Sequence, residues 1–562
     1  MTIQSDDLRN AWELDLLSFG LLSERDEFAL AQQSKALTKK LVGAVSSDAD
    51  TIAELKFLQA DIRCAGWSDR RETLLDDYLI GEFRKELYQF WYQSSEGLVD
   101  DLHQLYSLGS VGPGKALGAS GDSMYAKLFA SVLTTTSNYL YIAYKCSTSL
   151  TPVTHLAEMA RIADHGECRV VPGNKLTFVP KTDEVSRTIA IEPNLNMFYQ
   201  MGLGRVLTAR LEQFYDISLE TQPERQRELA YRGSLGQGIT TLDLSSASDT
   251  ISMKMLVANL PAEMVGWLSL LRSPSVTLPD GTTRKLNMVS SMGNAFTFPL
   301  ETIIFRAVIA AAATVHSGRD YGRKDPNIGV FGDDMAYPTE LHGKVTRLLD
   351  LLGFVVNSSK TFTEGPFRES CGHDYYYGHD VRPFYIKAVA TQQDKFVAIN
   401  IVVAWSARVG FFPSHVLQLL KGGLRINEVP PDEGFETGIL VPAPIQTRRR
   451  SGRHIYYAYR AKASSYAIKG ARVIAVGLLR KLTQNPAGVY CAWLYGSISR
   501  DRISVRQHRV TYLRKREETP NWGFFAVTSA LGQELLTRRH SDTIVQRWTT
   551  AAEAMRLVPP AT

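Results

Sequence analysis

Two adjacent carboxylates, Asp333 and Asp334, stand between short apolar runs in the segment from Asn327 to Pro338, which reads N-I-G-V-F-G-D-D-M-A-Y-P. Apolar arms around a Gly/Asp centre are typical of a β-hairpin with the carboxylates at its tip. Neighbouring carboxylates repel each other, and burial raises that cost unless the pair is exposed, protonated or neutralised by a cation. Because Mg²⁺ prefers carboxylate and phosphate oxygens, the alternatives here are a metal site and an exposed turn.

Small polar segments upstream contain further candidate residues. Asp243 ends an apolar strand in T-T-L-D-L-S-S-A-S-D, where small side chains leave room for a bulky ligand. Asp249, six residues later, is either a ligand or the N-cap of the next helix. The loop S-S-M-G-N, with Ser291, Gly293 and Asn294, opens a long helix. Its free N–H groups suit a ribose or a phosphate, and the alternative is ordinary helix capping.

Residues 168 to 193 alternate in the manner of β-strands and carry four cations, Arg169, Lys175, Lys181 and Arg187. These cations face either solvent or a triphosphate. Two metal ions about 3.5–4 Å apart would clamp the attacking and leaving oxygens of an in-line displacement. The three strand and hairpin carboxylates would hold both ions, and Lys181 and Arg187 would offset triphosphate charge. The residues therefore point to phosphoryl transfer.

Three of these segments, in chain order, resemble motifs A, B and C of RNA-directed RNA polymerases: D-L-S-S-A-S-D, S-M-G-N-A-F-T-F-P-L-E and F-G-D-D. The sequences of these motifs closely resemble those of the replicase catalytic β subunit of the small positive-strand RNA bacteriophages, the leviviruses. V-P-K-T-D-E-V-S-R-T-I-A-I-E-P resembles that family's motif F, and F-R-E-S-C-G-H-D-Y-Y-Y-G-H-D-V-R-P-F-Y-I-K resembles the stretch after its palm. The resemblance is clear from residue 168 to residue 388, and the motifs are specific when taken together.

The resemblance implies an α+β fold of the right-hand polymerase type, with fingers, palm, thumb and a ferredoxin-like antiparallel palm sheet. The expected domains are an N-terminal helical region with the fingers (1–229, motif F near 179–193), the palm (230–366), post-palm and thumb elements (367–447) and a basic RNA-contacting region (448–562).

The resemblance also assigns roles to residues. Asp243, Asp333 and Asp334 would bind two Mg²⁺ ions, with Mn²⁺ as the alternative metal. The nucleotide-binding residues would be Lys181, Arg187, Asp249, Ser291, Gly293 and Asn294. Lys360, in N-S-S-K-T-F, is a candidate proton donor to pyrophosphate. One departure is Phe331, where tyrosine is usual; it should leave metal binding intact.

The partners implied by the resemblance are an RNA template and product, NTPs, the host elongation factors Tu and Ts, and a host ribosomal protein. The acidic, helical N-terminal region is our expected contact for the host proteins. The expected location is the cytoplasm of the infected bacterial host, with no membrane.

Composition agrees with a globular, nucleic-acid-binding chain. The 562 residues are 44% apolar and 22% charged, and no run approaches the 18 apolar residues of a membrane span. The five cysteines are scattered, which argues against a disulfide framework. Arg448 to Arg516 holds 17 Lys/Arg and one acid, so it carries +16 while the rest of the +5 chain carries −11. Such a block, interleaved with tyrosines, indicates a polyanion partner; the alternative is a solvated basic face.

Two other functions stay open. A non-catalytic RNA-binding protein would explain the basic block but not the ordered carboxylates, and a reverse transcriptase would share the carboxylates. Cys371, His373 and His379 mimic a zinc cluster but lack a second cysteine, so packing or RNA contact is the preferred interpretation.

The pattern of elements is predicted most clearly around the motifs. Residues 1–160 should be mainly helical. A strand is expected over 239–244, a hairpin turn at 279–281, and a helix over 295–316 that stops at Gly318. Thr339 is the predicted cap of a helix that runs to Leu352 and ends at Gly353.

Overall fold

The structure is a computed structural model that describes residues 3–561 except 19, 21–22, 42–45, 47, 120, 318–322, 446–447, 451, 463–464, 470–471, 476–484, 496–497, 500–501, 505–509 and 537–540. It combines many α-helices with small, mostly antiparallel sheets, which confirms the predicted α+β class. Its buried apolar side chains form two large cores. One unites residues 79–354 with residues 491–492, and the other unites residues 3–41 with residues 376–555.

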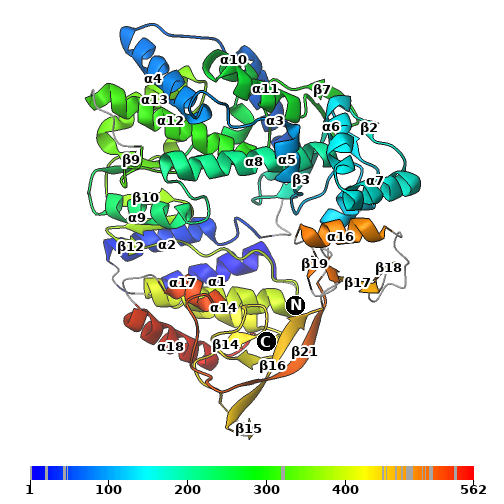
Figure 1. Ribbon diagram of the computed structural model, residues 1–562. Coiled ribbons are helices and arrows are strands. Elements are labelled where there is room, and N and C mark those ends of the chain that lie inside the picture. Colours follow the sequence, from blue (N-terminus) through cyan, green and yellow to red (C-terminus); the bar gives the residue numbers. More distant parts are fainter. Residues whose placement is uncertain are drawn as a thin grey trace.

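A three-stranded antiparallel sheet, of which β9 is labelled in Figure 1, contributes Leu242, Val330, Met335 and Tyr337 to the first core. Its order is β5-β9-β8, with β5 at Ile239–Leu242, β9 at Asp334–Pro338 and β8 at Gly329–Phe331. The helices that share this core are α4 (Leu74–Trp91), α8 (Asn194–Tyr215), α10 (Met253–Asn259), α11 (Ala262–Leu271), α12 (Thr297–Ser317) and α13 (His342–Leu351). Because α12 is apolar on nearly all sides, it can be covered by the sheet, α4, α8 and α13 together.

A second, mixed sheet lies beside the first and has the order β4-β3-β6-β7. Its strands are β3 (Asn174–Pro180), β4 (Ser186–Ile191), β6 (Ser275–Thr277) and β7 (Thr283–Lys285), and α3 (Ala49–Gly66) packs on β4. The chain segments that adjoin β5 and the β8–β9 hairpin contain further helices: α9 (Gln222–Ser234), η2 (Ala247–Thr250), η3 (Thr339–Leu341) and η4 (Ser358–Lys360). A three-stranded sheet follows, formed by β10 (Phe367–Ser370), β11 (His373–Tyr376) and β12 (His379–Asp380).

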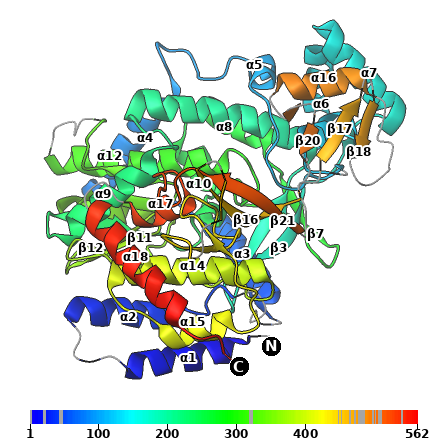
Figure 2. The ribbon, with the colours of Figure 1, turned by 90° about the horizontal axis from the view of Figure 1, so that it is seen from below.

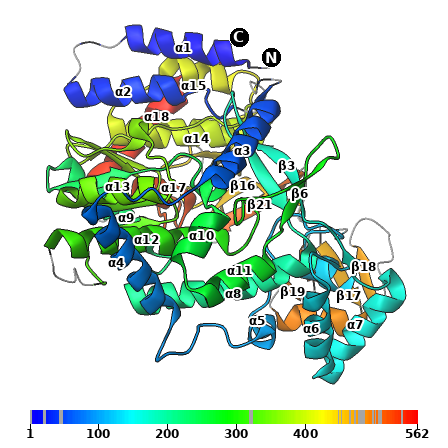
Figure 3. The same cartoon turned by 90° about the horizontal axis from the view of Figure 1, so that it is seen from above.

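An outlying lobe is visible at one side of the molecule in Figures 1 and 3. It contains α5 (Leu102–Ser107), η1 (Tyr125–Phe129), β1 (Thr134–Thr135), α6 (Asn138–Ser149), α7 (Pro152–His165) and β2 (Arg169–Val170). A distant part of the chain joins it: α16 (Pro486–Leu494) packs on α7, next to β17 (Ser465–Lys469), β18 (Arg472–Ala475), β19 (Ile498–Ser499) and β20 (Arg502–Ser504).

The second core brings the two ends of the chain together, as Figure 2 shows. Its elements are α1 (Ser5–Leu17), α2 (Glu24–Ala36), α14 (Gln392–Val409), α15 (Ser414–Lys421), α17 (Ala530–Leu535), α18 (Ser541–Leu557), β13 (Glu428–Val429), β14 (Ile439–Leu440) and β16 (Arg453–Ala461). The strands β15 (Arg448–Arg450) and β21 (Tyr512–Thr519) pair with β16 on either side. Asp15 of α1, 1% exposed, accepts backbone N–H bonds from His415 and Val416. One buried carboxylate thus caps α15 from the opposite end of the sequence.

Most predicted elements near the motifs are confirmed. The helical start, the strand at 239–242, the turn at 279–281 and the long helix are present. Thr339 instead begins a 3₁₀ turn, and α13 starts at His342. Gly353, with φ of 89°, ends that helix as predicted. Gly318, the predicted stop of α12, lies outside the described residues.

By length and composition, α12 is the one helix among the described residues that is apolar enough to cross a membrane. Most of it is buried inside the protein, where it contacts α4, α8, α13 and the sheet. Its apolar character is therefore accounted for by the first core.

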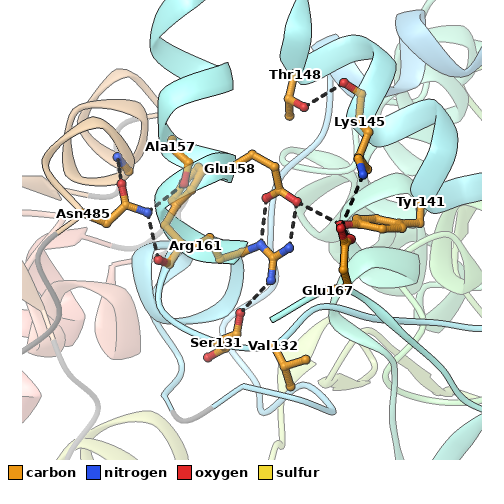
Figure 4. A network of polar contacts seen from close by, with 12 residues as sticks. Ser131, Val132, Tyr141, Lys145, Thr148, Ala157, Glu158, Arg161, Glu167 and Asn485 are labelled. Atoms are coloured by element: carbon orange, nitrogen blue, oxygen red, sulfur yellow. Dashed lines mark hydrogen bonds and ion pairs between the residues drawn. The ribbon is translucent and has the colours of Figure 1, made fainter. Parts of the chain in front are cut away.

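A buried ion pair stabilises the outlying lobe (Figure 4). The Arg161 guanidinium, 0% exposed, donates to both Glu158 carboxylate oxygens at 2.7 Å and to the Gly166 carbonyl at 2.9 Å. The neighbouring Asn485 amide, from the start of α16, donates to the carbonyl of Ala157 at 2.8 Å and to that of Phe129. The network fixes α7 and α16 to one another.

We expect Glu158→Gln to destabilise the protein by about 3–5 kcal/mol, because it leaves the Arg161 charge buried without its counter-charge. Thermal unfolding, with limited proteolysis of the lobe, measures the effect. The matched control is Glu13→Gln, an exposed position on α1. Equal unfolding midpoints for the two variants would contradict the assigned role of the pair.

Candidate active site

The hairpin that carries the two adjacent carboxylates is held tightly against α12. Gly332 and Asp333 form the two-residue loop between β8 and β9, and Gly332 has φ of 61°. Its N–H donates to Thr302 Oγ1 at 3.0 Å. A Cβ at Gly332 would lie 2.5 Å from the Phe298 ring. Both the positive φ and the close approach of α12 therefore require glycine at this position.

Strand pairing brings Asp243 to the same end of the sheet. β5 and β9 are antiparallel, and Leu242 is the register partner of Met335. The next pair in that register is Asp243 and Asp334, just past the end of β5. Residues directly opposite in antiparallel strands have Cβ atoms about 4.5–5.5 Å apart. Three carboxylates from two distant segments therefore meet at one end of the sheet.

The carboxylates raise one another's affinity for protons. Burial raises the pKa of Asp334 to about 7, and the Asp333 charge adds to the effect; hydrogen bonds from Cys371 oppose it. Burial, followed by the Asp243 charge, likewise raises the pKa of Asp333. This combination is the signature of clustered acidic groups that need a counter-charge.

Two side-chain donors contact the Asp243 carboxylate. Lys360 Nζ lies 3.2 Å from Asp243 Oδ2, and Asn357 Nδ2 donates to the same oxygen at 3.2 Å. Burial alone would lower the pKa of Lys360, but the carboxylates of Glu369 and Asp243 raise it. The predicted proton donor is therefore next to the acidic cluster and holds its proton at neutral pH.

The donor chemistry of this cluster fits a divalent cation. Its ligands are carboxylate oxygens, which hard cations prefer, and a cation would offset the burial and the repulsion that raise the pKa values of Asp333 and Asp334. Across the described residues, no three His, Cys, Asp or Glu side chains are preassembled around a common point. The side chains of Asp243, held by Lys360, and Asp334, held by Cys371, would have to turn to share an ion.

The loop before α12 positions the predicted ribose-binding residues. Ser291 Oγ donates to Asp249 Oδ1 at 2.7 Å. Burial raises the pKa of Asp249 to about 6. Asn294 is 7% exposed, and its Nδ2 has no hydrogen-bond partner among the described residues. The loop therefore has an acceptor, a hydroxyl and a spare amide donor.

Gly293 fixes this loop to the hairpin that carries the predicted triphosphate cations. It has φ of 118°, and a Cβ there would lie 2.0 Å from the Ala190 carbonyl of β4. The Ala190 N–H donates to the Met292 carbonyl at 2.7 Å. Only glycine allows the loop to approach the strand so closely.

Lys181 and Arg187 stand on the β3–β4 hairpin near the acidic cluster. Burial lowers the pKa of Lys181, and the charges of Arg187 and Lys360 add to that effect while Asp333 opposes it. Lys181 also lowers the pKa of Asp249. The structure thus brings Lys181 into electrostatic reach of Asp333 and Asp249, and Arg187 is close enough to Lys181 to repel its charge.

Two further residues lie at the site: Glu301 was not predicted from the sequence, and Cys371 was predicted only as a packing or RNA-contact residue. Glu301 of α12 is 5% exposed; burial and the charges of Asp333 and Asp249 raise its pKa well above the ordinary value. Cys371 and Gly372, with φ of 47° and 73°, form the tight turn between β10 and β11, and Cys371 donates to Asp334. The sequence places Glu301 one helical turn after Thr297, but it does not predict which distant residues lie next to Glu301 in space.

His373 and His379 belong to the strands that follow Cys371. Burial and the Arg382 charge lower the pKa of His373 to about 4, so the imidazole is neutral at physiological pH. The Cys371 thiol points instead to Asp334. The cysteine thus has a local role at the hairpin carboxylates.

Comparison with known proteins gives one family. A family model described as RNA replicase, beta-chain, matches residues 113–430, a range that includes every site residue discussed above. The RNA-directed RNA polymerase subunit beta of Qbeta virus (strain MX1) is 36% identical over 329 residues, which are 56% of this chain and 55% of that protein. The beta chain of Escherichia phage MS2 is 38% identical over 266 residues, 47% of each chain. The chain spans about half the length of the curated relatives it matches.

Among solved structures, the RNA-dependent RNA polymerase of a human picorbirnavirus aligns with a TM-score of 0.42 and 11% identity, over 75% of this chain and 82% of that one.

The acidic cluster should make stability depend on pH. Asp334 has a pKa of about 7 in the folded chain against an ordinary value of 3.8, so the folded state binds more protons and stability falls as pH rises through this range. Without divalent cations, we expect Asp334→Asn to stabilise the protein at pH 8 by up to about 4 kcal/mol, with little gain at pH 4. Thermal unfolding at both pH values checks this. Asp164→Asn, at an exposed position, is the control, and an equal effect of Asp334→Asn at both pH values would contradict the assignment.

Proposed function

The chain belongs to the RNA replicase beta-chain family, and we propose that it is an RNA-directed RNA polymerase that copies a positive-strand viral RNA genome from NTPs. The observation that carries the proposal is the antiparallel register of β5 and β9, which sets Asp243 opposite Asp334 beside Asp333. Clustered carboxylates at a strand end are what metal-assisted nucleotidyl transfer requires.

In this proposal the chain has the right-hand polymerase fold, with fingers, palm and thumb. The β5-β9-β8 sheet with α12 and α13 is the core of a ferredoxin-like palm (230–366), and residues 1–229 include the fingers with motif F. Residues 367–447 supply post-palm and thumb elements, and residues 448–562 contact RNA. The antiparallel sheet, with α12 packed on β8 and α13 packed on α12, supports the assignment of the palm.

Asp243, Asp333 and Asp334 would hold two Mg²⁺ ions, with Mn²⁺ as the alternative. When bound, such ions stabilise the charge on the attacking and leaving oxygens. Lys181 and Arg187 would bind the triphosphate, because Lys181 lies within electrostatic reach of Asp333 and Arg187 adds a second positive charge next to Lys181. Lys360, whose pKa is raised by Glu369 and Asp243, gives its proton to the leaving pyrophosphate oxygen.

The ribose would lie against the loop before α12. Asp249, oriented by Ser291, accepts a hydrogen bond from the 2′-hydroxyl, and the free Asn294 amide donates one to the sugar. Gly293 leaves this loop in contact with the β4 strand, so that sugar and triphosphate sites are held at a fixed separation.

The proposal extends to surroundings that the resemblance implies. RNA template and product, NTPs, the host elongation factors Tu and Ts and a host ribosomal protein are the proposed partners. The cytoplasm of the infected bacterium is the proposed location. Co-purification of the chain with host proteins tests the partners.

We expect Asp333→Asn to reduce ribonucleotide incorporation on an RNA template by at least about 10³-fold, because it removes one charge from the cation site. Affinity for RNA should stay within about twofold, since RNA affinity comes mainly from phosphate contacts elsewhere. Incorporation of labelled NTPs and RNA-binding titrations measure the two effects. Full activity in this variant would refute the metal assignment, and loss of RNA binding alone would favour a non-catalytic RNA-binding protein.

The ribose contact predicts sugar selectivity. The unaltered chain should prefer ribo- over deoxyribonucleotides, and Asp249→Ala should reduce that preference about 10- to 100-fold, the worth of a hydrogen bond to a charged group. Parallel incorporation assays with NTPs and dNTPs measure it, with Asp164→Ala as the control. Equal use of both nucleotides by the unaltered chain would favour a reverse transcriptase.

A further inference from the structure

A cavity of about 340 Å³ opens beside the β15-β16-β21 sheet of the second core. Its volume is near the lower end of the range of about 300–1,000 Å³ found for ligand pockets. Its walls come from residues 426–428, 444–445 and 454–457, together with Arg514 and Trp522. None of these residues belongs to the candidate active site.

The walls combine flat rings, a guanidinium and exposed apolar side chains. The Arg514 guanidinium carbon lies 4.2 Å from the centre of the Tyr457 ring. Ile426 and Ile445 line the same cavity and are 50% and 73% exposed. A tyrosine ring and an arginine guanidinium with apolar neighbours provide surfaces on which an unstacked base can stack.

Buried contacts hold the walls in place. The Asn427 side chain, 6% exposed, donates to the Tyr457 carbonyl at 2.9 Å and accepts from Arg514 Nε at 3.3 Å. Trp522 donates to the Val441 carbonyl at 3.0 Å, and its ring meets the edge of Tyr456. A preorganised pocket loses little conformational entropy on binding.

The charges around the cavity favour an anion. The acids beside it are all paired with cations: Glu428 pairs with Arg556 at 2.8 Å, Glu518 pairs with Arg516, and Glu433 and Glu517 share Arg460. Within the described part of the chain, Arg453, Arg514 and Lys515 of the same sheet form no ion pair with an acidic side chain. A ligand with phosphates would therefore find uncompensated positive charge next to the aromatic wall.

We propose that this cavity binds one base of single-stranded RNA, stacked on Arg514 and Tyr457, while the adjoining phosphates lie along the cations of β16 and β21. The inference rests on the proposed use of RNA, and it adds a binding site that is separate from the catalytic carboxylates. A protein side chain is the other occupant that apolar walls would accept, but the uncompensated cations favour RNA.

The test measures the affinity of the full-length chain for a fluorescent 12-nucleotide oligoadenylate and for an abasic oligomer of equal length and charge. We expect Tyr457→Ala to weaken oligoadenylate binding about 5- to 100-fold, the usual effect of losing one stacked base, and to leave abasic binding unchanged. Tyr457→Phe should bind like the unaltered chain, because stacking needs no hydroxyl. Ile445→Asp, at an exposed position that folding tolerates, should weaken binding as well.

Tyr78→Ala is the matched control, since Tyr78 is 68% exposed on α4, outside the basic region and away from the cavity. RNA carrying 5-iodouridine should crosslink to Tyr457 or Trp522. Unchanged oligoadenylate affinity in both Tyr457→Ala and Ile445→Asp would overturn the proposal and leave a protein as the occupant to seek. Ribonucleotide incorporation measured in parallel reports on the proposed polymerase function separately.

Discussion

Electrostatic repulsion among Asp243, Asp333 and Asp334 is the constraint on which the centre of this protein depends. Burial and mutual charge raise the pKa values of the two hairpin carboxylates, so the site is unfavourable until a cation or a proton neutralises it. The fold maintains this arrangement because the antiparallel β5–β9 register leaves no other position for Asp243. The surrounding structure therefore has to be rigid enough to oppose the repulsion.

That rigidity comes from close backbone contacts at two glycines. Gly332 lets the hairpin loop press on α12, and Gly293 lets the loop before α12 press on β4. Gly332 contacts α12 itself, and Gly293 lies in the loop that leads into α12, a helix that is buried along most of its length. The acidic cluster, the loop before α12 and the cationic hairpin therefore pack on α12 directly or through that loop. The dense packing of the first core resists a shift in any of them.

The sequence predicts the local elements of the site well because hairpins, strand ends and helix starts are encoded by adjacent residues. Asp333, Asp334 and Asp243 were predicted from patterns of at most twelve residues each. Glu301 and Cys371 were not found as site residues, because what matters for them is which distant groups they meet in space. The same limit applies to the second core, where α1 and α2 pack with α14 and α18 from the other end of the chain. The long helix α14 was also missed, since its nearly continuous burial hides a one-sided apolar pattern.

The uneven distribution of charge along the chain affects the pairing of the β15-β16-β21 sheet as well as the binding of a polyanion. β21 is an edge strand whose residues are mostly exposed, and its cations stand opposite tyrosines of β16: Arg514 faces Tyr459, and Arg516 faces Tyr457. Cross-strand pairs of this kind stabilise the sheet, while charges on an edge strand discourage pairing with other chains. Because Arg514 reaches diagonally over Tyr457, the pairing that protects the edge also creates a flat cationic surface. A strand built in this way keeps its positive charge in solvent, where a polyanion can reach it without the cost of burying charge.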